Sequence, residues 1–407
     1  MSEQATESHL VHQPLGRVGL IVFITFLSVF PPLATDMYMP SMPELRDDFG
    51  ISSSVGSLTI VLFFLFFGIG QLIFGTLSDK YGRKPVLMVG LAIFTLGSVG
   101  CALAPNILVM LICRTLQALG GGAGGAVGMA LVKDCFTERM RERVLVVTQA
   151  GNSLGPVIAP IIGGWIATFA TWRLTFWVLA AIGLLCLVMG VFYRETNLPH
   201  MRYTGTLAGN FGRMAVVAKN RGFSLFLLAL ACIAAPFMGY VTTSSYVYMD
   251  FFAMGSTAYS LFFAAAALLC VAAPFVYLLL NRWINVRMMI NISLAVGVAC
   301  GVALLFAGRI SPWAFFICIV PSLVFSSVIR PGATNALLMQ HDGDTGSASS
   351  LINFVYTIVG FAGAGFAALP WPEYITANGV CTMVFMLIGF GIWAYLLRSS
   401  LPLKGIK

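Results

Sequence analysis

The chain has 407 residues, of which 59% are hydrophobic and only 9% are charged, and its mean hydropathy is +0.92. Soluble domains carry about 25% charged residues, so this composition excludes an ordinary soluble fold. The net charge of +8 is attributed to basic loops at a membrane surface rather than to nucleic-acid binding. The nine cysteines lie singly, without metal-site spacing, and are expected to be packing residues.

Most of the sequence consists of uncharged apolar stretches that are long enough to cross a bilayer as helices, which takes about 20 residues each. Their length and glycine content favour helices over a β-barrel, whose strands would be about ten residues of alternating polarity. We therefore expect an all-α polytopic membrane protein with twelve transmembrane helices. Their approximate ranges are 17–39, 54–77, 85–104, 106–130, 144–168, 173–193, 223–247, 258–280, 287–307, 312–339, 347–369 and 374–397.

The longest polar interruption, 194–222, separates six expected spans from six others. We expect two six-helix bundles, 17–193 and 223–397, joined by this linker, with tails at 1–16 and 398–407. This arrangement is typical of pseudo-symmetric transporters, whose substrate site lies near the midplane where the halves meet. Lysine and arginine gather in the loops on one side, which predicts that both tails and the linker are cytoplasmic.

Asp36 is an acidic residue near the outer end of the first expected span, within the sequence TDMYMP. An ionisable group inside a span is costly unless it faces a cavity or a partner, so its presence indicates a function. A carboxylate that can take up and release a proton is what a proton-coupled carrier needs. The alternative is that Asp36 lies at the level of the headgroups and caps the turn at Pro40.

A short charged turn, GTLSDKYGRKP, joins the second and third expected spans. Gly75 permits close helix packing, Gly82 permits a tight reversal, and Asp79 can accept hydrogen bonds at a helix N-terminus. The pattern G-x-L-x-D-x-x-G-R-K resembles motif A of the major facilitator superfamily. The resemblance implies that these residues, with Arg83 and Lys84, form a latch on the cytoplasmic side. In that family the latch joins the two halves and helps to switch between outward-open and inward-open states; the alternative is a generic basic loop.

Arg114 lies in the fourth expected span, in RTLQALG, at a depth comparable with that of Asp36. This stretch resembles motif B of the superfamily, whose arginine is implicated in proton transfer. We therefore expect Arg114 to modulate Asp36 during proton coupling. The alternative is that it only binds carbonyl groups and fixes helix packing.

The fifth expected span contains GNSLGPVIAPIIGG, which resembles motif C, a signature associated with exporters in this superfamily. Its characteristic residues here are Gly155, Pro156, Gly163 and Gly164. Small residues permit close packing against a neighbouring helix, and prolines bend a span. The motif indicates export, although a bent packing helix would serve uptake equally well.

Four further stretches, TDMYMP, WRLTF, RET and SYVY, together resemble the Bcr/CflA subfamily of drug/proton antiporters. The resemblance runs through nearly the whole chain and is densest in the first half. It implies an exporter of small organic compounds, such as drugs or antibiotics, in the bacterial inner membrane. A twelve-span carrier can function as a monomer, and we expect a monomer here. Its partners would be the small-molecule substrate, protons and the lipid bilayer.

Two alternatives to drug export are considered. A carrier for nucleosides, siderophores or similar metabolites would use the same fold, possibly importing by proton symport. A membrane-embedded enzyme or receptor is disfavoured by the motif A turn, the two-half layout and the single acid within a span. We see no G-x-x-x-x-G-K-[ST] loop, metal constellation or catalytic triad in the sequence, so we expect no enzyme activity, cofactor, metal or nucleic-acid partner.

Arg330 lies in the tenth expected span, directly before Pro331, and belongs to no motif of the family. It could bind an anionic or carbonyl-rich substrate in a cavity. Alternatively, it extends toward the cytoplasm or binds backbone carbonyls freed by Pro331. Other polar or aromatic side chains that could contact a substrate are Tyr38, Gln149, Asn152, Phe237, Tyr240, Asn335, Asn353 and Tyr356.

Overall fold

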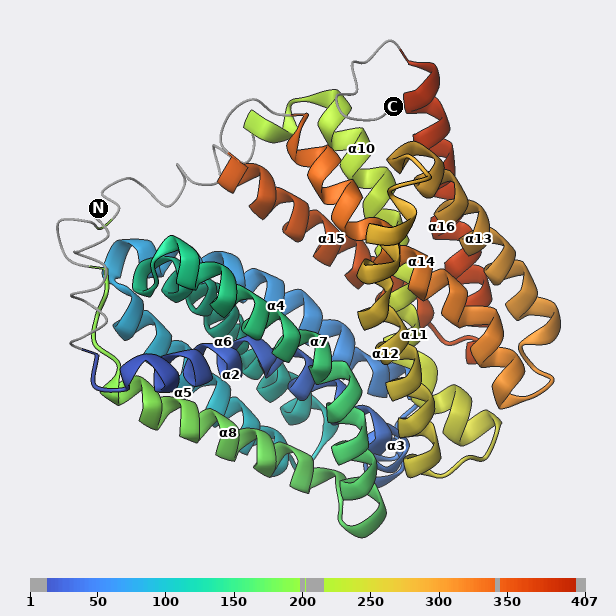
Figure 1. Ribbon diagram of the computed structural model, residues 1–407. Helices are drawn as coiled ribbons and strands as arrows, with labels where there is room; N and C mark the ends of the chain where they lie inside the picture. The colour runs from blue at the N-terminus through green and yellow to red at the C-terminus, as the bar shows by residue number, and fades with distance from the viewer. Residues whose placement is uncertain (1–12, 198–201, 203–215, 341–344, 400–407) are drawn as a thin grey trace. The chain divides into compact units, whose positions relative to one another are not determined.

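The computed structural model (Figure 1) describes residues 13–197, 202, 216–340 and 345–399, and within them it is built of helices and short turns. Most of the N-terminal tail, most of the expected 194–222 linker and nearly all of the C-terminal tail lie outside the described residues. The structure therefore confirms the expected all-helical class for the part of the chain that it describes.

Contacts within the chain divide it into two compact units. The first comprises Met1–Ile51 and Leu62–Leu207, and the second comprises Ser52–Val61 and Ala208–Lys407. The helices that begin in the first part of the chain are α2 (Gly16–Asp36), η1 (Met39–Ser41), α3 (Met42–Phe49), α4 (Ser53–Tyr81), α5 (Arg83–Ala102), α6 (Ile107–Cys135), α7 (Glu138–Phe169) and α8 (Trp172–Phe192).

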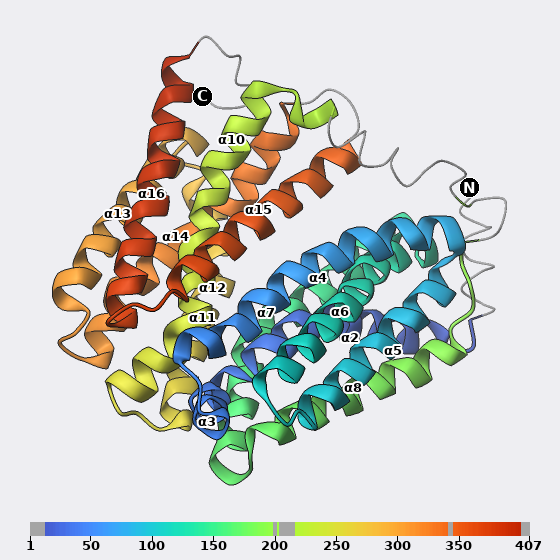
Figure 2. The same ribbon diagram turned by 180° about the vertical axis from the view of Figure 1, so that it is seen from behind.

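The second unit contains the remaining helices, which Figure 2 shows from the opposite side. They are α10 (Arg221–Ala231), η3 (Cys232–Ala234), α11 (Ala235–Ser245), η4 (Tyr246–Phe251), α12 (Ser256–Leu280), α13 (Val286–Ala307), α14 (Pro312–Leu338), α15 (Thr345–Ala367) and α16 (Tyr374–Arg398). The first residues of α4 also belong to this unit, although the rest of α4 belongs to the first.

Ten helices in the described part of the chain are long and apolar enough to cross a membrane, and counting the bent first pair as one span gives eleven. The expected segment 347–369 falls on α15, where the apolar stretch Leu351–Ala367 is shorter than these. Each expected span thus coincides with a helix, and the chain is a multi-pass membrane protein.

Two of the expected spans are broken where proline interrupts the helix. The first bends by 46° between Gly16–Phe30 and Pro32–Phe49. The seventh passes from α10 through the 3₁₀ turn η3 into α11 and ends in a π-helical turn. Proline cannot donate the helical hydrogen bond four residues back and clashes with that carbonyl, so Pro236 accounts for the tightened turn before it.

Glycines on α6 bring the backbones of α4 and α5 into direct contact with it in the first unit. A Cβ at Gly97 of α5 would lie 2.6 Å from the backbone nitrogen of Gln117. A Cβ at Gly122 of α6 would lie 2.5 Å from the backbone nitrogen of Gln71 on α4. Such spacing is available only to glycine, so α4, α5 and α6 form the tightly packed core that holds Arg114.

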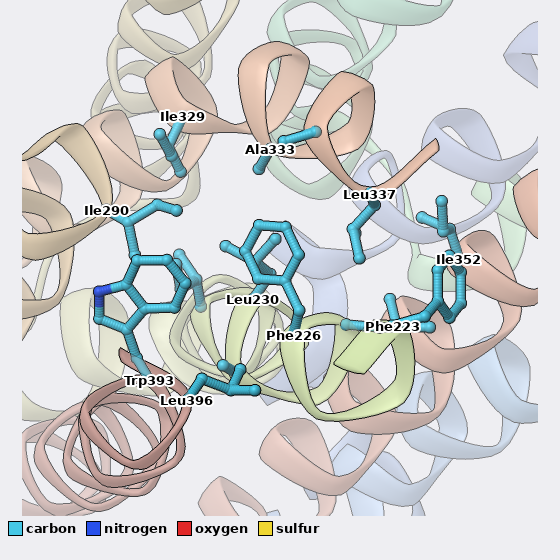
Figure 3. Close-up of a cluster of buried hydrophobic side chains, with 14 of the residues drawn as sticks. Phe223, Phe226, Leu230, Ile290, Ile329, Ala333, Leu337, Ile352, Trp393 and Leu396 are labelled. Atoms are coloured by element: carbon cyan, nitrogen blue, oxygen red, sulfur yellow. The ribbon is translucent and has the colours of Figure 1, made fainter. Parts of the chain in front are cut away.

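The second unit has a side-chain core in which residues of α10 pack against residues of helices α13 to α16 (Figure 3). The rings of Phe226 on α10 and Trp393 on α16 stack with centroids 5.5 Å apart. The Trp393 indole nitrogen donates to the side-chain oxygen of Asn291 on α13 at 2.7 Å, which satisfies its polar atom in this apolar setting.

Candidate functional site

Asp36 is the last residue of α2 and is only 5% exposed. Its side-chain oxygen Oδ1 accepts a hydrogen bond of 2.8 Å from the hydroxyl of Thr35. The buried residues Met37, Tyr38 and Met39 follow it as the chain turns into η1. The bend near Pro32 and this turn place the carboxylate at a helix end inside the first unit rather than on an exposed face.

Arg114 on α6 is fully buried and binds the end of the helix that carries Asp36. Its Nη1 donates to the carbonyl oxygen of Ala34 at 2.9 Å and to the side-chain oxygen of Gln117 at 2.7 Å. Ala34 lies in the last turn of α2, where carbonyl groups have no partner within the helix. A cation at this end is also favoured by the helix dipole. Arg114 therefore contacts the helix turn that carries Asp36, through the backbone carbonyl two residues earlier.

Three aromatic rings surround the Arg114 guanidinium. The distances from its Cζ to the ring centroids are 4.6 Å for Phe63, 5.1 Å for Tyr38 and 5.5 Å for Phe176. Ring faces attract a cation, and more strongly when water is excluded. These rings come from α4, the turn after α2 and α8, so the charge is enclosed by side chains from three parts of the first unit.

Gln117 extends the polar contacts of Arg114 toward α5. Its side-chain nitrogen donates to the Ser98 hydroxyl at 2.8 Å, and Ser98 in turn donates to the Phe94 carbonyl oxygen at 2.7 Å. All of these groups are buried, and the chain of donors and acceptors orients the arginine.

The motif C residues pack α7 against the part of α2 that carries Asp36. A Cβ at Gly155 would lie 2.5 Å from Cγ of Pro32, and a Cβ at Gly163 would overlap the carbonyl oxygen of Met37. Pro156 lies inside α7 next to this contact, and Gly164 is buried beside Gly163. The structural role of this motif is thus the close approach of α7 to the bend in α2.

The motif A residues form a charged cluster between the ends of α4, α5 and α6. Arg83 pairs with Asp79 on α4 at 2.5 Å and with Asp134 on α6 at 3.0 Å. Its Nη1 also donates to the hydroxyl oxygen of Ser78 at 2.8 Å. Gly75 lies one turn earlier on α4, where a Cβ would contact Ala126 at 3.6 Å. One arginine thereby joins three helices.

Glu195 caps the N-terminus of α5 directly beside this cluster. Its two carboxylate oxygens accept the backbone N–H groups of Arg83 at 2.9 Å and Lys84 at 3.0 Å. Gly82 has a φ of +107°, and a Cβ there would lie 2.5 Å from Glu195. The Lys84 ammonium donates to the Val191 carbonyl oxygen at 2.7 Å. An acid at a helix N-terminus is electrostatically favoured. At α5 this acid is Glu195. Asp79, which the sequence suggested for such a position, pairs with Arg83 instead.

Sequence reasoning missed the partners that lie far along the chain. Asp134 is 51 residues from Arg83, and Glu195 is 112 residues from it. Asn197 donates to the carbonyl oxygens of Ser78 and Asp79 at 3.2 and 3.0 Å. The available signal was an acid directly after the end of the sixth span, in the stretch RET.

The substrate-contact candidates are distributed over both units. In the first, Tyr38 is buried against Arg114, Asn152 is exposed on α7, and the side chain of Gln149 lies outside the described part. In the second, Tyr240 is buried in a stack with Phe263, and Phe237 is half-buried.

Arg330 and Tyr356 are brought together by α14 and α15. The Arg330 guanidinium carbon lies 5.6 Å from the centroid of the Tyr356 ring. Asn335 and Asn353 are exposed on the same two helices.

The sequence matches the Major Facilitator Superfamily over residues 21–364. This span is most of the chain, and the chain belongs to that family of membrane transporters, which are not enzymes.

The curated relatives include transporters of bacteria. The chain is 29% identical over 358 residues to the uncharacterized MFS-type transporter YdgK of Bacillus subtilis, covering 86% of this chain and 89% of the relative. It is 25% identical over 357 residues to a bicyclomycin resistance protein homolog of Haemophilus influenzae, with the same coverage. It is 27% identical over 278 residues to the multidrug resistance protein MdtL of Klebsiella pneumoniae, covering 68% of this chain and 70% of the relative.

Solved structures of other transporters share the fold. The peptide transporter POT matches with a TM-score of 0.76 at 15% identity, over 98% of this chain and 99% of that one. A bacterial homolog of the human lysosomal transporter Spinster matches with a TM-score of 0.73 at 15% identity, over 98% of each chain. At this identity the likeness concerns the fold alone.

Proposed function

We propose that this transporter exports small organic compounds, including antibiotics, in exchange for protons, and that it belongs to the Bcr/CflA subfamily. Relatives named for bicyclomycin resistance and multidrug resistance, together with the motif C packing of α7, support export. The protein acts as a monomer in the bacterial inner membrane, with both termini in the cytoplasm.

The single observation that carries proton coupling is the position of Asp36. It is a buried carboxylate at the end of a bent helix in the membrane, and Arg114 binds the last turn of that helix. An ionised acid buried inside a span is energetically costly, so its presence indicates a function. Protonation neutralises the carboxylate and removes that cost. Proton uptake at Asp36 would relieve the repulsion between the carboxylate and the carbonyl end of α2, and so change the geometry at the bend.

Antiport follows if substrate and proton stabilise different states of the carrier. A ligand shifts a conformational equilibrium only by its difference in affinity between the states, and the coupling is reciprocal. In this proposal the substrate favours the state in which Asp36 is ionised, and release of the substrate follows protonation. The cluster of Asp79, Arg83 and Lys84 then holds one of the two states as a latch.

The test is substrate-driven proton movement in everted membrane vesicles loaded with a pH-sensitive dye. Adding bicyclomycin or chloramphenicol should release protons through the wild-type protein. Asp36→Asn and Asp36→Ala should both abolish the signal, whereas Asp36→Glu should retain part of it, because it keeps a titratable group. Full activity of Asp36→Asn, with Asp36→Ala inactive, would show that the side chain is needed for shape and not for titration.

Direction is tested separately in liposomes under an imposed pH gradient. Export by antiport requires that labelled bicyclomycin moves against the proton flux. Movement with the proton flux, or transport of nucleosides or siderophores alone, would replace drug export by a metabolite carrier. Tyr38, Gln149, Asn152, Phe237, Tyr240, Asn335 and Asn353 are proposed as substrate contacts for substitution in the same assay.

A further inference from the structure

Arg330 is a positive charge placed well inside a transmembrane helix. It lies in α14 (Pro312–Leu338), eight residues before the end of the helix, or about 12 Å at 1.5 Å per residue. Its side chain is exposed in the structure, and its guanidinium carbon lies 5.6 Å from the centroid of the Tyr356 ring on α15. It therefore turns toward the neighbouring helix.

The face of α14 that carries Arg330 differs from the face that meets lipid. The exposed apolar residues Trp313 and Ile317 (64% and 66%) mark the lipid side of this helix. At 100° per residue, Arg330 lies roughly 100° and 140° around the helix from them. Its neighbours Ile329 and Ala333 point into the hydrophobic core (Figure 3). A charge between the core and the lipid face must meet water, a polar group or a ligand.

Helix α15 also carries polar side chains close in sequence to Tyr356. Asn353 and Thr357 lie on the same side of α15 as Ala364 and Ala368, within roughly 60° around the helix axis. Ala364 and Ala368 are covered by Val61, from the start of α4. Nearer the other end of α15, Asn353 is exposed, and Thr357 is partly exposed, its hydroxyl donating to the Asn353 carbonyl oxygen at 2.8 Å. An amide and a hydroxyl thus stand on the helix that presents Tyr356 to Arg330.

We infer that Arg330 and Tyr356 form an anion-recognition site, which selects exported compounds that carry a carboxylate or a comparable anionic group on an apolar body. The inference rests on the proposed function, because the ligand is the exported compound. The Tyr356 ring attracts the guanidinium, and the N–H groups of the guanidinium would bind a carboxylate in bidentate fashion. The ring also limits the movement of the arginine before the ligand arrives.

Tyr356 also contacts the core of the second unit. It packs against the hydrophobic cluster of the second unit that contains Ile352 and Trp393. Its position is therefore set by the fold, and the ring keeps the guanidinium next to α15 instead of letting it extend along α14. This geometry favours ligand recognition over the two structural roles considered for Arg330 from the sequence.

The test compares two probes of the same shape and different charge, 1-naphthoate and 1-naphthamide, by isothermal titration with the purified full-length protein at pH 7. Wild type should bind naphthoate about tenfold or more tightly than naphthamide, as expected for hydrogen bonds to a charged group. Arg330→Gln should lose this preference and keep naphthamide binding, which also shows that the variant is folded. Arg330→Lys should keep a smaller preference of the same sign.

Matched controls separate the site from general electrostatics. Arg287→Gln removes the same charge from an exposed position at the start of α13 and should leave the preference unchanged. Tyr356→Phe should keep it, because the ring remains, whereas Tyr356→Leu should reduce it. Equal binding of both probes by wild type, or a preference that survives in Arg330→Gln, would overturn the inference.

These outcomes are independent of transport because no gradient is applied. Proton-coupled efflux of bicyclomycin without any preference for naphthoate would refute the anion site and leave the proposed function standing. A preference that depends on Arg330, in a protein that moves no proton with substrate, would refute the antiport and leave the anion site standing.

Discussion

The Arg114 guanidinium donates to the carbonyl oxygen of Ala34 at 2.9 Å, two residues before Asp36. The two ionisable residues that sequence reasoning assigns to proton coupling are thus joined through the backbone of α2. A change in the protonation of the carboxylate would reach Arg114 as a change in the geometry of the last turn of α2.

Replacement of Arg114 by alanine should destabilise the protein strongly. It would leave the Ala34 carbonyl oxygen and the Gln117 side-chain oxygen buried without their donor, and it would open a cavity among three rings. We expect a loss of about 3–5 kcal/mol in the free energy of unfolding. Arg114→Lys keeps the charge and should lose less. Denaturation of the detergent-purified protein measures both, and equal losses would contradict the role of the arginine geometry.

Substitution of Gly163 by alanine should disrupt the contact between α7 and α2. The added methyl group would meet the Met37 carbonyl oxygen, a backbone atom that cannot move alone. We expect about 1–3 kcal/mol of destabilisation, with reduced transport. Gly391→Ala is the matched control, since a Cβ at Gly391 meets nothing within 4 Å. Thermal unfolding of the two variants side by side decides whether the tight approach matters.

The two acids that pair with Arg83 should contribute unequally. The Asp134 side chain is 23% exposed, whereas that of Asp79 is 44% exposed. Because solvent screens the more exposed pair, Asp134→Asn should cost about 1 kcal/mol or more and Asp79→Asn less. Chemical unfolding gives the order of the two, and a larger loss for Asp79→Asn would mean that exposure does not govern these pairs.

Loss of the Glu195 cap should weaken the start of α5. Glu195→Ala leaves two backbone N–H groups without their acceptor, and we expect a cost of about 1–2 kcal/mol. Glu195→Gln keeps one acceptor oxygen and should lie between the wild type and Glu195→Ala. Asp47→Ala, which removes an acid that is 68% exposed, serves as the control and should change stability by less than about 0.5 kcal/mol. Hydrogen exchange at Arg83 and Lys84 would localise the effect.

Most of the fold could be predicted because it follows from local composition. The length of each apolar run sets the helix, and the charged turn that contains Asp79 and Arg83 lies between two such runs. The 3₁₀ turn in the seventh span has a local cause in Pro236, but the π turn at its end depends on packing that the sequence does not display. Tertiary context therefore overrides a continuous helix there.

The site could be predicted only in part. Asp36 and Arg114 are conspicuous because charges are costly inside a membrane. The partner of Arg114 is the backbone carbonyl of Ala34, 80 residues away, so no pattern of side chains in the sequence predicts this contact. Glu195 is equally remote from the helix that it caps. The contact between Arg330 and Tyr356 depends on how α14 and α15 pack together, which the sequence does not display.

Helices α4, α5 and α6 are in contact twice, once through glycines along their length and once through Arg83, Asp79 and Asp134 at one end. Where backbones are in direct contact, few side chains lie between the helices that could repack. We therefore expect the three helices to move together as one rigid body. Asp134 lies at the end of α6, and Arg114 lies about 30 Å from it along the same helix, at 1.5 Å per residue. A displacement of the charged end would therefore be transmitted along α6 to Arg114, so the residues of the two motifs would move together.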